Sequence, residues 1–226
     1  MPKPPYKKFS IVLPIYIPNE EIRDMSDINF LLAKSKAPKD VEWVIVETGS
    51  RYYLNDADIY IYEKERTHPD ISTDRGFRVA TGEYVVFLSN DITVCDGWIE
   101  KMYRCFEENE DCGVASLGNN EHNDFIQDKI TSDCSPYFSV CMIKKEDAWF
   151  DLSYPFNFAD TDLLFRVHKD GKKWYKNLNG LIYHKNQATC GKYGGSQDGY
   201  RESRAYFLNK YIDYKDDVVY KILGGV

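Results

Sequence analysis

The sequence predicts an α/β fold built on a mostly parallel central sheet that is flanked by helices. Three observations support this prediction. Apolar, β-branched runs recur along the first half of the chain, they are continuous rather than alternating with polar residues, and segments of helical periodicity separate them. The chain has 226 residues and a hydrophobic fraction of 43%, which is enough to fill the core of one domain.

The predicted strands of the first half are four short runs bounded by turn residues: FSIVLPIY (9–16), VEWVIVE (41–47), DIYIYE (58–63) and EYVVFLS (83–89). Continuous apolar runs are typical of strands that are buried on both faces. A crossover helix is expected over residues 20–36, where apolar residues recur at helical spacing, namely Ile22, Met25, Ile28, Leu31 and Leu32. Repeated strand and helix units indicate a nucleotide-binding type of sheet.

The second half of the chain predicts fewer regular units. Helices are expected after Asp91, over DGWIEKMYRCFEEN, and over DTDLLFRVHKDG, which Gly171 is placed to end. A strand is expected at SPYFSVCMIKK. The run KKWYKNLNGLIYHKN predicts a strand, a turn at Asn179-Gly180 and a second strand that leads to His184. The tail YRESRAYFLNKYIDYKD shows roughly helical spacing of aromatic and leucine residues among many charges.

One domain is expected over residues 1–226, because no repeat, linker or low-complexity segment interrupts the chain. The ending KILGGV resembles a cut more than a natural terminus. It therefore stays open whether the chain is one domain of a longer protein.

Charge and cysteine usage limit the partners and the compartment. A formal net charge of −7 and a pI near 5.2 argue against nucleic acid, although a few local cations can hold a small phosphorylated ligand. The apolar run at the N-terminus is broken by Pro14 and Pro18, so neither a signal peptide nor a membrane span is expected. Six scattered cysteines without a CxxC pair favour free thiols over a disulfide framework and predict a cytoplasmic protein.

The most informative single position is Asp91, which follows the apolar strand EYVVFLS. Ligands of open α/β sheets bind outside the carboxyl ends of the strands, and a carboxylate there can bind a divalent cation. A turn or helix-capping aspartate is the alternative, and the position alone favours it.

The block STDRGFRVATGEYVVFLSNDITVCDGWIEKM around Asp91 resembles the central signature of glycosyltransferase family 2. In that signature, an Asn-x-Gly-x-x-x-Ala-x-Gly-Glu-Tyr run leads through a strand to an Asp-x-Asp-like metal motif and then to Gly-Trp. The matching residues are Gly76, Ala80, Gly82, Glu83, Tyr84, Asp91, Gly97 and Trp98. The resemblance extends to FSIVLPIYIP, VEWVIVETGS and FADTDLLFRVHKDGKKWY, the last similar to the family's Glu-Asp-x-Asp-Leu-x-x-x-Arg block.

Four positions depart from the family pattern. Ser89 stands where an acid is common, Asp74 replaces an asparagine, Glu47 replaces an aspartate, and Ala159 replaces the glutamate of the Glu-Asp pair. None of the four departures removes Asp91, Asp160 or His184.

The resemblance implies a GT-A fold, with a nucleotide-sugar-binding half over about residues 1–95 and an acceptor-binding, base-carrying half over about residues 96–226. It also implies an inverting, metal-dependent glycosyltransferase of the hexosyltransferase type. Such an enzyme moves a sugar from a nucleotide-diphosphate sugar, with UDP favoured, to a hydroxyl group of a glycan or glycoconjugate. By the same resemblance, Asp91 and His184 would bind the metal, which is Mn²⁺ or Mg²⁺. Mn²⁺ is favoured because it accepts imidazole more readily.

Asp160 is the candidate general base by resemblance, and its alternative role is to cap the following helix. Asp162 is expected to be structural and to pair with Arg166. Trp98 would form an acceptor-binding platform, or it belongs to the core. The donor-binding candidates are Pro14, Tyr16, Glu47, Asn90 and Asp91, with Arg201, Arg204 and Lys192 for the diphosphate.

Two further functions stay open. A nucleotidyltransferase also places acids after a sheet, but the segment LPIYIPNEE lacks the glycine-rich, basic phosphate loop expected after its first strand. A catalytically inactive domain that binds a sugar nucleotide or a glycan would be compatible with Ser89 and Ala159.

Overall fold

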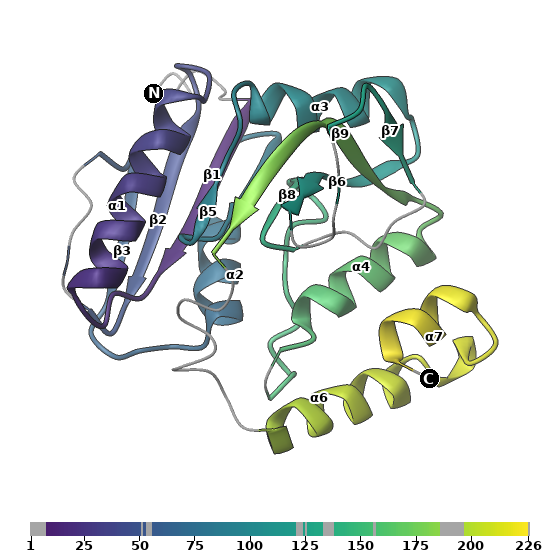
Figure 1. The fold of residues 1–226 in the computed structure, drawn as a ribbon. Helices are drawn as coiled ribbons and strands as arrows, with labels where there is room; N and C mark the ends of the chain where they lie inside the picture. Colours follow the sequence, from purple (N-terminus) through teal and green to yellow (C-terminus); the bar gives the residue numbers. More distant parts are fainter. Residues whose placement is uncertain are drawn as a thin grey trace, which may run out of the picture.

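The computed structural model describes residues 8–225, apart from residues 51, 53–55, 121–123, 125, 133–137, 156 and 186–196. Within these residues, nine strands form a mixed sheet with helices on both faces, so the predicted α/β fold is confirmed (Figure 1). In spatial order the strands are β3 (Ile59–Glu63), β2 (Glu42–Thr48), β1 (Phe9–Ile15), β4 (Tyr84–Leu88), β8 (Val140–Lys144), β6 (Cys112–Asn119), β9 (Lys173–His184) and β5 (Ile92–Thr93), and β7 (Ile130–Thr131) pairs with β9.

The first four strands of this order are parallel, as the continuous apolar runs predict. Beyond them, β8 runs antiparallel to both β4 and β6, and β6 runs parallel to β9. The sheet therefore has a parallel half, made by the N-terminal strands, and a mixed half, made by the later strands.

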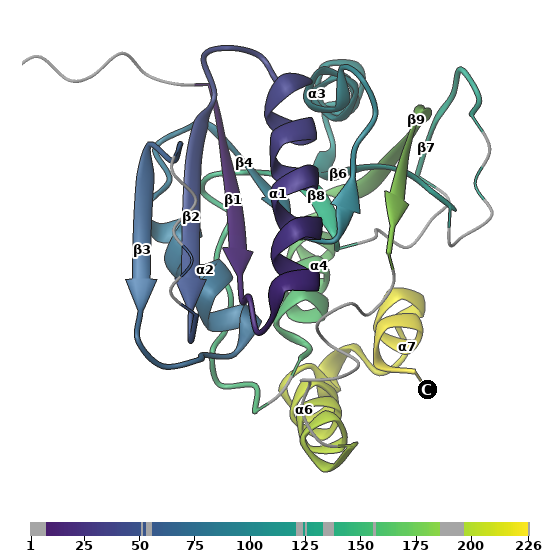
Figure 2. The same cartoon turned by 60° about the vertical axis from the view of Figure 1, so that its left-hand side comes forward.

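Two helix layers cover the sheet, and they sit on opposite faces (Figure 2). Side chains of α1 (Glu20–Ser35) and α3 (Trp98–Glu108) pack with one set of alternate strand residues, and those of α2 (Pro69–Val79) and α4 (Ala159–Lys169) pack with the other set. The strand residues are buried on both faces because each face has its own apolar helix layer. No helix in the described part of the chain is long and apolar enough to cross a membrane.

The predicted hairpin at Asn179-Gly180 is wrong. Lys173–His184 is one strand, β9, whose register against β6 shifts between Leu117 and Gly118. Residues 178–180 of β9 form a bulge at this shift instead of a turn. The residues before and after the bulge both pair with β6, so the strand keeps its direction. As a result, β9 runs on to His184 at the edge of the sheet where β4 ends.

Two glycines of the signature block have steric roles. A Cβ atom at Gly76 would lie 2.3 Å from Val12 Cγ1, so a glycine there allows α2 to pack closely on β1. A Cβ atom at Gly82 would lie 2.7 Å from the backbone nitrogen of Ser10. Both contacts are shorter than side-chain packing allows. The glycines therefore hold α2 and the start of β4 against the sheet beneath the cavity described below.

Asp162 links α4 to the end of α6 (Gln197–Lys210), the helix that precedes α7 (Val218–Gly224). Its side chain is 0% exposed, and its carboxylate accepts hydrogen bonds from Arg166 Nε at 2.9 Å and Lys210 Nζ at 2.5 Å. The hydroxyl groups of Tyr154 and Tyr211 donate to the same carboxylate at 2.9 and 2.8 Å. The expected structural role and the pairing with Arg166 are confirmed.

Replacing Asp162 by asparagine is expected to lower the free energy of unfolding by about 3–5 kcal/mol, because Arg166 would lose its buried counter-charge and Lys210 would keep only Asp151. Urea unfolding followed by tryptophan fluorescence measures this loss. Asp96→Asn is the matched control, since the Asp96 side chain is 91% exposed, and it should change stability by less than about 0.5 kcal/mol. Equal stability of the two variants would contradict the structural role of Asp162.

Candidate functional site

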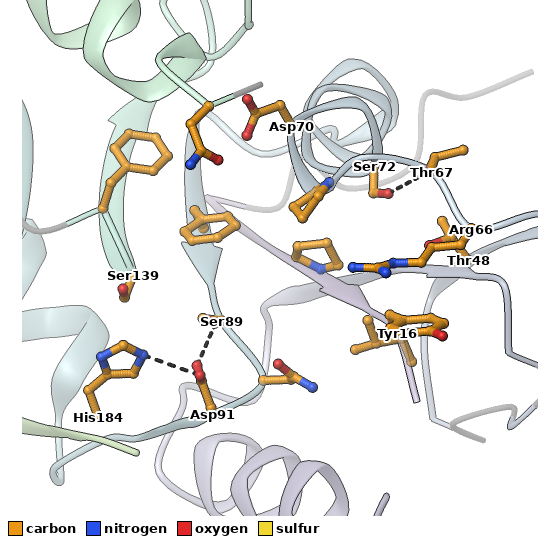
Figure 3. A pocket seen from close by; sticks show the side chains of 17 residues that line it. Tyr16, Thr48, Arg66, Thr67, Asp70, Ser72, Ser89, Asp91, Ser139 and His184 are labelled. Carbon is orange, nitrogen blue, oxygen red and sulfur yellow. Dashed lines mark hydrogen bonds and ion pairs between the residues drawn. The ribbon is translucent and has the colours of Figure 1, made fainter. Parts of the chain in front are cut away.

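A cavity of about 260 Å³ opens at the carboxyl ends of β1, β2 and β4 (Figure 3). This is the edge of an open α/β sheet where ligands bind, because loops there diverge and leave space. The cavity is lined by Pro14, Ile15, Tyr16, Thr48, Arg66, Thr67, Pro69, Asp70, Ser72, Phe87, Ser89, Asn90, Asp91, Phe138, Ser139, Asn157 and His184.

Asp91 and His184 meet in this cavity although 92 positions separate them. The short strand β5 pairs with the end of β9, and this register places Ile92 opposite His184. His184 Nε2 lies 3.2 Å from Asp91 Oδ2, and Ser89 Oγ donates to Asp91 Oδ1 at 2.6 Å (Figure 3). Asp91 is 5% exposed. The carboxylate is thus held from both sides, by a hydroxyl group and by an imidazole ring.

The donor set of this pair fits a divalent cation. Neighbouring ligands of an octahedral ion with bonds of about 2.1 Å lie about 3 Å apart, and the Asp91–His184 separation is 3.2 Å. A carboxylate and an imidazole together suit Mn²⁺ better than Mg²⁺, which prefers oxygen ligands. Among the described residues, no group of three or more His, Cys, Asp or Glu side chains gathers around a common point. The remaining ligands would therefore come from water and a bound phosphate group.

Asp160 lies in the first turn of α4, three residues after the cavity residue Asn157. It does not line the cavity itself. Burial raises the pKa of the Asp160 carboxyl group above its ordinary value, and a hydrogen bond from Thr161 N–H at 2.7 Å opposes this shift. A carboxylate whose pKa moves toward neutral pH is a stronger base than an exposed one.

Tyr16 and Arg66 form one wall of the cavity (Figure 3). The guanidinium carbon of Arg66 lies 4.4 Å from the centre of the Tyr16 ring, which is a cation–π contact. The positive φ of 65° at Gly49 and the lack of a side chain there allow this approach, because a Cβ atom at Gly49 would lie 2.6 Å from Arg66 Cβ. The wall presents an aromatic face and a positive charge to the cavity.

Asn90 lines the cavity, and its position is held by α1. Its side-chain Nδ2 donates to Ser26 Oγ at 2.8 Å, and its carbonyl oxygen accepts from Asn29 Nδ2 at 3.0 Å. Pro14 and Tyr16 line the cavity as well, at the end of β1. All three residues lie where they could contact a nucleotide-sugar donor, and this role stays a prediction.

Glu47 was expected to contact the donor base or ribose. Its packing does not favour this role, which stays a prediction. The residue is 0% exposed. Glu47 Oε1 accepts from Ser50 Oγ at 2.9 Å and from the backbone N–H of Tyr52 at 2.5 Å, and Oε2 accepts from the hydroxyl group of Tyr60. Both oxygens therefore hold the chain after β2 to β3.

Trp98 does not form an acceptor platform. It is 0% exposed, and its indole Nε1 donates to the carbonyl oxygen of Ala33 at 3.3 Å. Of the two roles expected from the sequence, the core role is the one observed. A sugar cannot stack on an indole ring that is enclosed by α1 and the sheet.

Arg201 and Arg204, the arginines of α6, do not line the cavity. Arg204 donates through Nε and Nη2 to the carbonyl oxygens of Gly224 and Gly225, both at 2.7 Å, so it caps the end of α7. This capping does not favour the diphosphate role expected for Arg204, which stays a prediction. Arg201 is exposed on α6, and its donor role stays a prediction. Lys192 lies outside the described residues.

Arg66, Asp70 and Ser89 are among the cavity residues that were not expected from the sequence as ligand-binding groups. Asp70 belongs to the first turn of α2, where an acidic residue is ordinary, and Arg66 lies in the loop before α2. Ser89 was noted only as a departure from an acidic motif. The one available signal was position, because all three follow the carboxyl end of a strand.

The sequence was also compared with known proteins. A family model described as Glycosyl transferase family 2 matches residues 10–170. The match runs from β1 to the end of α4 and includes Asp91 and Asp160, while His184 lies beyond it. No curated protein matches the sequence.

Proposed function

The chain belongs to glycosyltransferase family 2, and from this premise we propose that it is a metal-dependent, inverting enzyme of the hexosyltransferase type. The donor is a nucleotide-diphosphate sugar, with UDP favoured, and the acceptor is a hydroxyl group of a glycan or glycoconjugate. The observation that carries the proposal is the Asp91–His184 pair at the edge of the cavity, 3.2 Å apart. It supplies the carboxylate and imidazole that a cation bound to a diphosphate requires.

Asp91 and His184 would hold the divalent cation, and Mn²⁺ is favoured because imidazole is one of its ligands. When bound, the cation supplies Lewis-acid stabilisation of the leaving diphosphate. Ser89 orients the Asp91 carboxylate through its hydrogen bond of 2.6 Å. The Asp-x-Asp-like motif thus has one acid, Asp91, and a serine in place of the other. The Ser89 hydroxyl group keeps the Asp91 carboxylate in a fixed orientation.

Tyr16 and Arg66 bind the nucleotide. The Tyr16 ring offers an aromatic face for the base, and Arg66 offers a guanidinium group that can stack on the same base or reach a phosphate oxygen. Pro14 shapes the wall beside them. This assignment replaces the C-terminal arginines by a cation that lines the cavity.

Asp160 acts as the general base. It accepts the proton of the acceptor hydroxyl group while the oxygen forms a bond to the anomeric carbon of the donor. The bond between that carbon and the diphosphate oxygen breaks, and its electron pair leaves with the nucleotide diphosphate. Because the acceptor attacks opposite the leaving group, a single displacement inverts the anomeric centre.

A donor screen by thermal shift tests the proposal. UDP-, dTDP- and GDP-linked sugars are each added at 100 times the expected Kd, with Mn²⁺ or with EDTA. A true donor should stabilise the folded state by about 2.7 kcal/mol, which raises Tm by about 5–10 °C for a chain of this size. Failure of every donor to raise Tm in the presence of Mn²⁺ would contradict the proposed function.

Hydrolysis of the same donors separates an active enzyme from an inactive binding domain. Ser89 at the metal motif and Ala159 at the start of α4 are the two departures that favour the inactive alternative. A donor that binds with Mn²⁺ and is slowly hydrolysed by water supports the transferase, whereas a donor that binds and never releases its nucleotide supports a binding domain.

A further inference from the structure

Asp70 lines the same cavity as Asp91 and His184, and the mechanism above does not use it. It belongs to the first turn of α2, and its side chain is 20% exposed. Figure 3 shows its carboxyl group on the α2 side of the cavity, with Asp91 and His184 on the other side. Asp70 is therefore a second carboxyl group that lines the cavity, apart from the Asp91–His184 pair.

The polar neighbour of Asp70 is His68, the N-cap residue of α2. His68 Nδ1 accepts a hydrogen bond from the backbone N–H of Asp70 at 3.2 Å, so this nitrogen carries a lone pair and no proton. Burial, together with the charge of Arg66, lowers the pKa of His68 and keeps the ring neutral at pH 7. Nδ1 lies 3.6 Å from Asp70 Oδ2. A neutral ring at this position supplies no positive charge that would favour the ionised form of Asp70.

The other charged groups that face Asp70 come from four elements. They are Arg66 from the chain after β3, Asp160 from α4, Asp91 from the chain after β4 and His184 from β9. Asp74, one turn further along α2, is paired with Arg78. Within the described part of the chain, no lysine or arginine forms an ion pair with Asp70, and Asp160 acts on it as a like charge.

We propose that Asp70 contacts the sugar of the donor as a neutral carboxylic acid, so that the site contains one protonated carboxyl group, Asp70, and one ionised base, Asp160. The inference rests on the proposed function. A neutral carboxyl group donates through its O–H and accepts through its carbonyl oxygen, so it recognises a pair of neighbouring sugar hydroxyl groups. Asp70 transfers no proton in the reaction, because Asp160 receives the proton of the acceptor.

The protonation states follow from burial and from the coupling of the two acids. Burial, and then the negative charge of Asp160, raise the pKa of Asp70 to about 8. The N-terminus of α2 favours the ionised form, and burial outweighs it. Burial also raises the pKa of Asp160. Hydrogen bonds from Thr161 favour the ionised form of Asp160, and no such contribution lowers the pKa of Asp70, so the first proton leaves Asp160 and the second leaves Asp70.

The pH dependence of stability gives a readout without any ligand. The folded-state pKa of Asp70, about 8, lies above its ordinary value of 3.8. Asp70 therefore stabilises the fold most below pH 4, and this contribution is lost as the pH rises toward 8. Asparagine copies the neutral form at every pH. The Tm of Asp70→Asn should exceed that of the wild type at pH 8, and the difference should be smaller at pH 5.

Calorimetric binding tests the contact with the sugar. The probes are UDP-glucose, UDP-galactose and UDP-N-acetylglucosamine, with UDP as the sugar-free probe, at pH 7 and pH 9 with Mg²⁺. The proteins are the wild type, Asp70→Asn, Asp70→Ala and the exposed control Asp96→Asn. From pH 7 to pH 9 the neutral fraction of a group with a pKa of about 8 falls about tenfold.

The wild type and Asp96→Asn should lose about tenfold in affinity for the bound UDP-sugar between pH 7 and pH 9, while UDP binding changes less than about twofold. Asp70→Asn should keep its affinity at both values, and Asp70→Ala should bind the UDP-sugar at least about fivefold more weakly at pH 7 with UDP binding unchanged. The same pH dependence in Asp70→Asn as in the wild type, or an equal loss of UDP and UDP-sugar, would overturn the inference alone. A wild type that binds none of the four nucleotides would contradict the UDP-linked donor on which the inference rests, and the inference with it.

Discussion

Asp91→Asn is expected to lower metal-dependent sugar transfer at least about a hundredfold. Asparagine keeps the size of the side chain and can still accept from Ser89, but it removes the negative charge that a cation requires. His184 alone is a weak site for a hard cation. The rate of nucleotide release at increasing Mn²⁺ concentration measures the effect, and the variant should need a much higher concentration of metal.

The matched control for Asp91→Asn is Asp96→Asn, five residues further along the chain and 91% exposed. It should show the metal dependence of the wild type. His184→Ala should weaken metal binding less than Asp91→Asn does, because it removes a neutral ligand and leaves the carboxylate. If Asp91→Asn kept the metal dependence of the wild type, Asp91 would be a turn residue and the metal site would lie elsewhere.

Asp160→Asn is expected to bind the donor as the wild type does and to transfer sugar about 10²–10⁴-fold more slowly, since a general base contributes about this much. Asparagine keeps the hydrogen bond from Thr161 N–H, so the start of α4 should remain folded. Steady-state kinetics with calorimetric donor binding separates the two effects. Unchanged transfer would remove Asp160 from the role of base.

The pH dependence of transfer gives a second test of Asp160. The base must be ionised, and burial raises its pKa, so the rate should increase with pH through that raised pKa. The Asp160→Asn variant should lack this increase. A wild-type rate that is flat from pH 4 to pH 7 would show that no carboxyl group with a raised pKa limits the reaction.

Local patterns predicted most of the fold. Continuous apolar runs mark β1 to β4 within one or two residues, and the helical stripes mark α1, α3 and α4. The failure at Asn179-Gly180 shows the limit of such patterns. The dipeptide is a strong local turn signal, yet pairing of β9 with β6 on both sides of it decides the direction of the chain.

Part of the candidate site could be predicted because the resemblance gives the order of motifs. The approach of His184 to Asp91 depends on the β5–β9 register, which no local pattern encodes. The burial of Glu47 and Trp98 could not be predicted from local patterns. Their positions in the sequence suit a ligand-binding role, and only the packed structure shows that both side chains are 0% exposed and that the Tyr60 hydroxyl group bonds to Glu47.

Arg66 and Asp70 show what sequence reasoning misses in a site of this kind. Both lie around the start of α2, where charged residues are common and usually face water. Their place in the cavity follows from the close packing of α2 on β1 at Gly76 and from the approach of Gly49 to Arg66. Gly76, in the signature block, thus positions α2 with Asp70, and Gly49 positions Arg66 beside Tyr16.

The most direct test of the central claim is nucleotide release from a UDP-sugar by the wild-type protein, measured with Mn²⁺ and again after EDTA. The account predicts release that requires Mn²⁺, returns when Mn²⁺ is restored after EDTA, and is lost in Asp91→Asn. Release that persists at the same rate in EDTA would contradict the assignment of Asp91 and His184 as a metal site that serves sugar transfer.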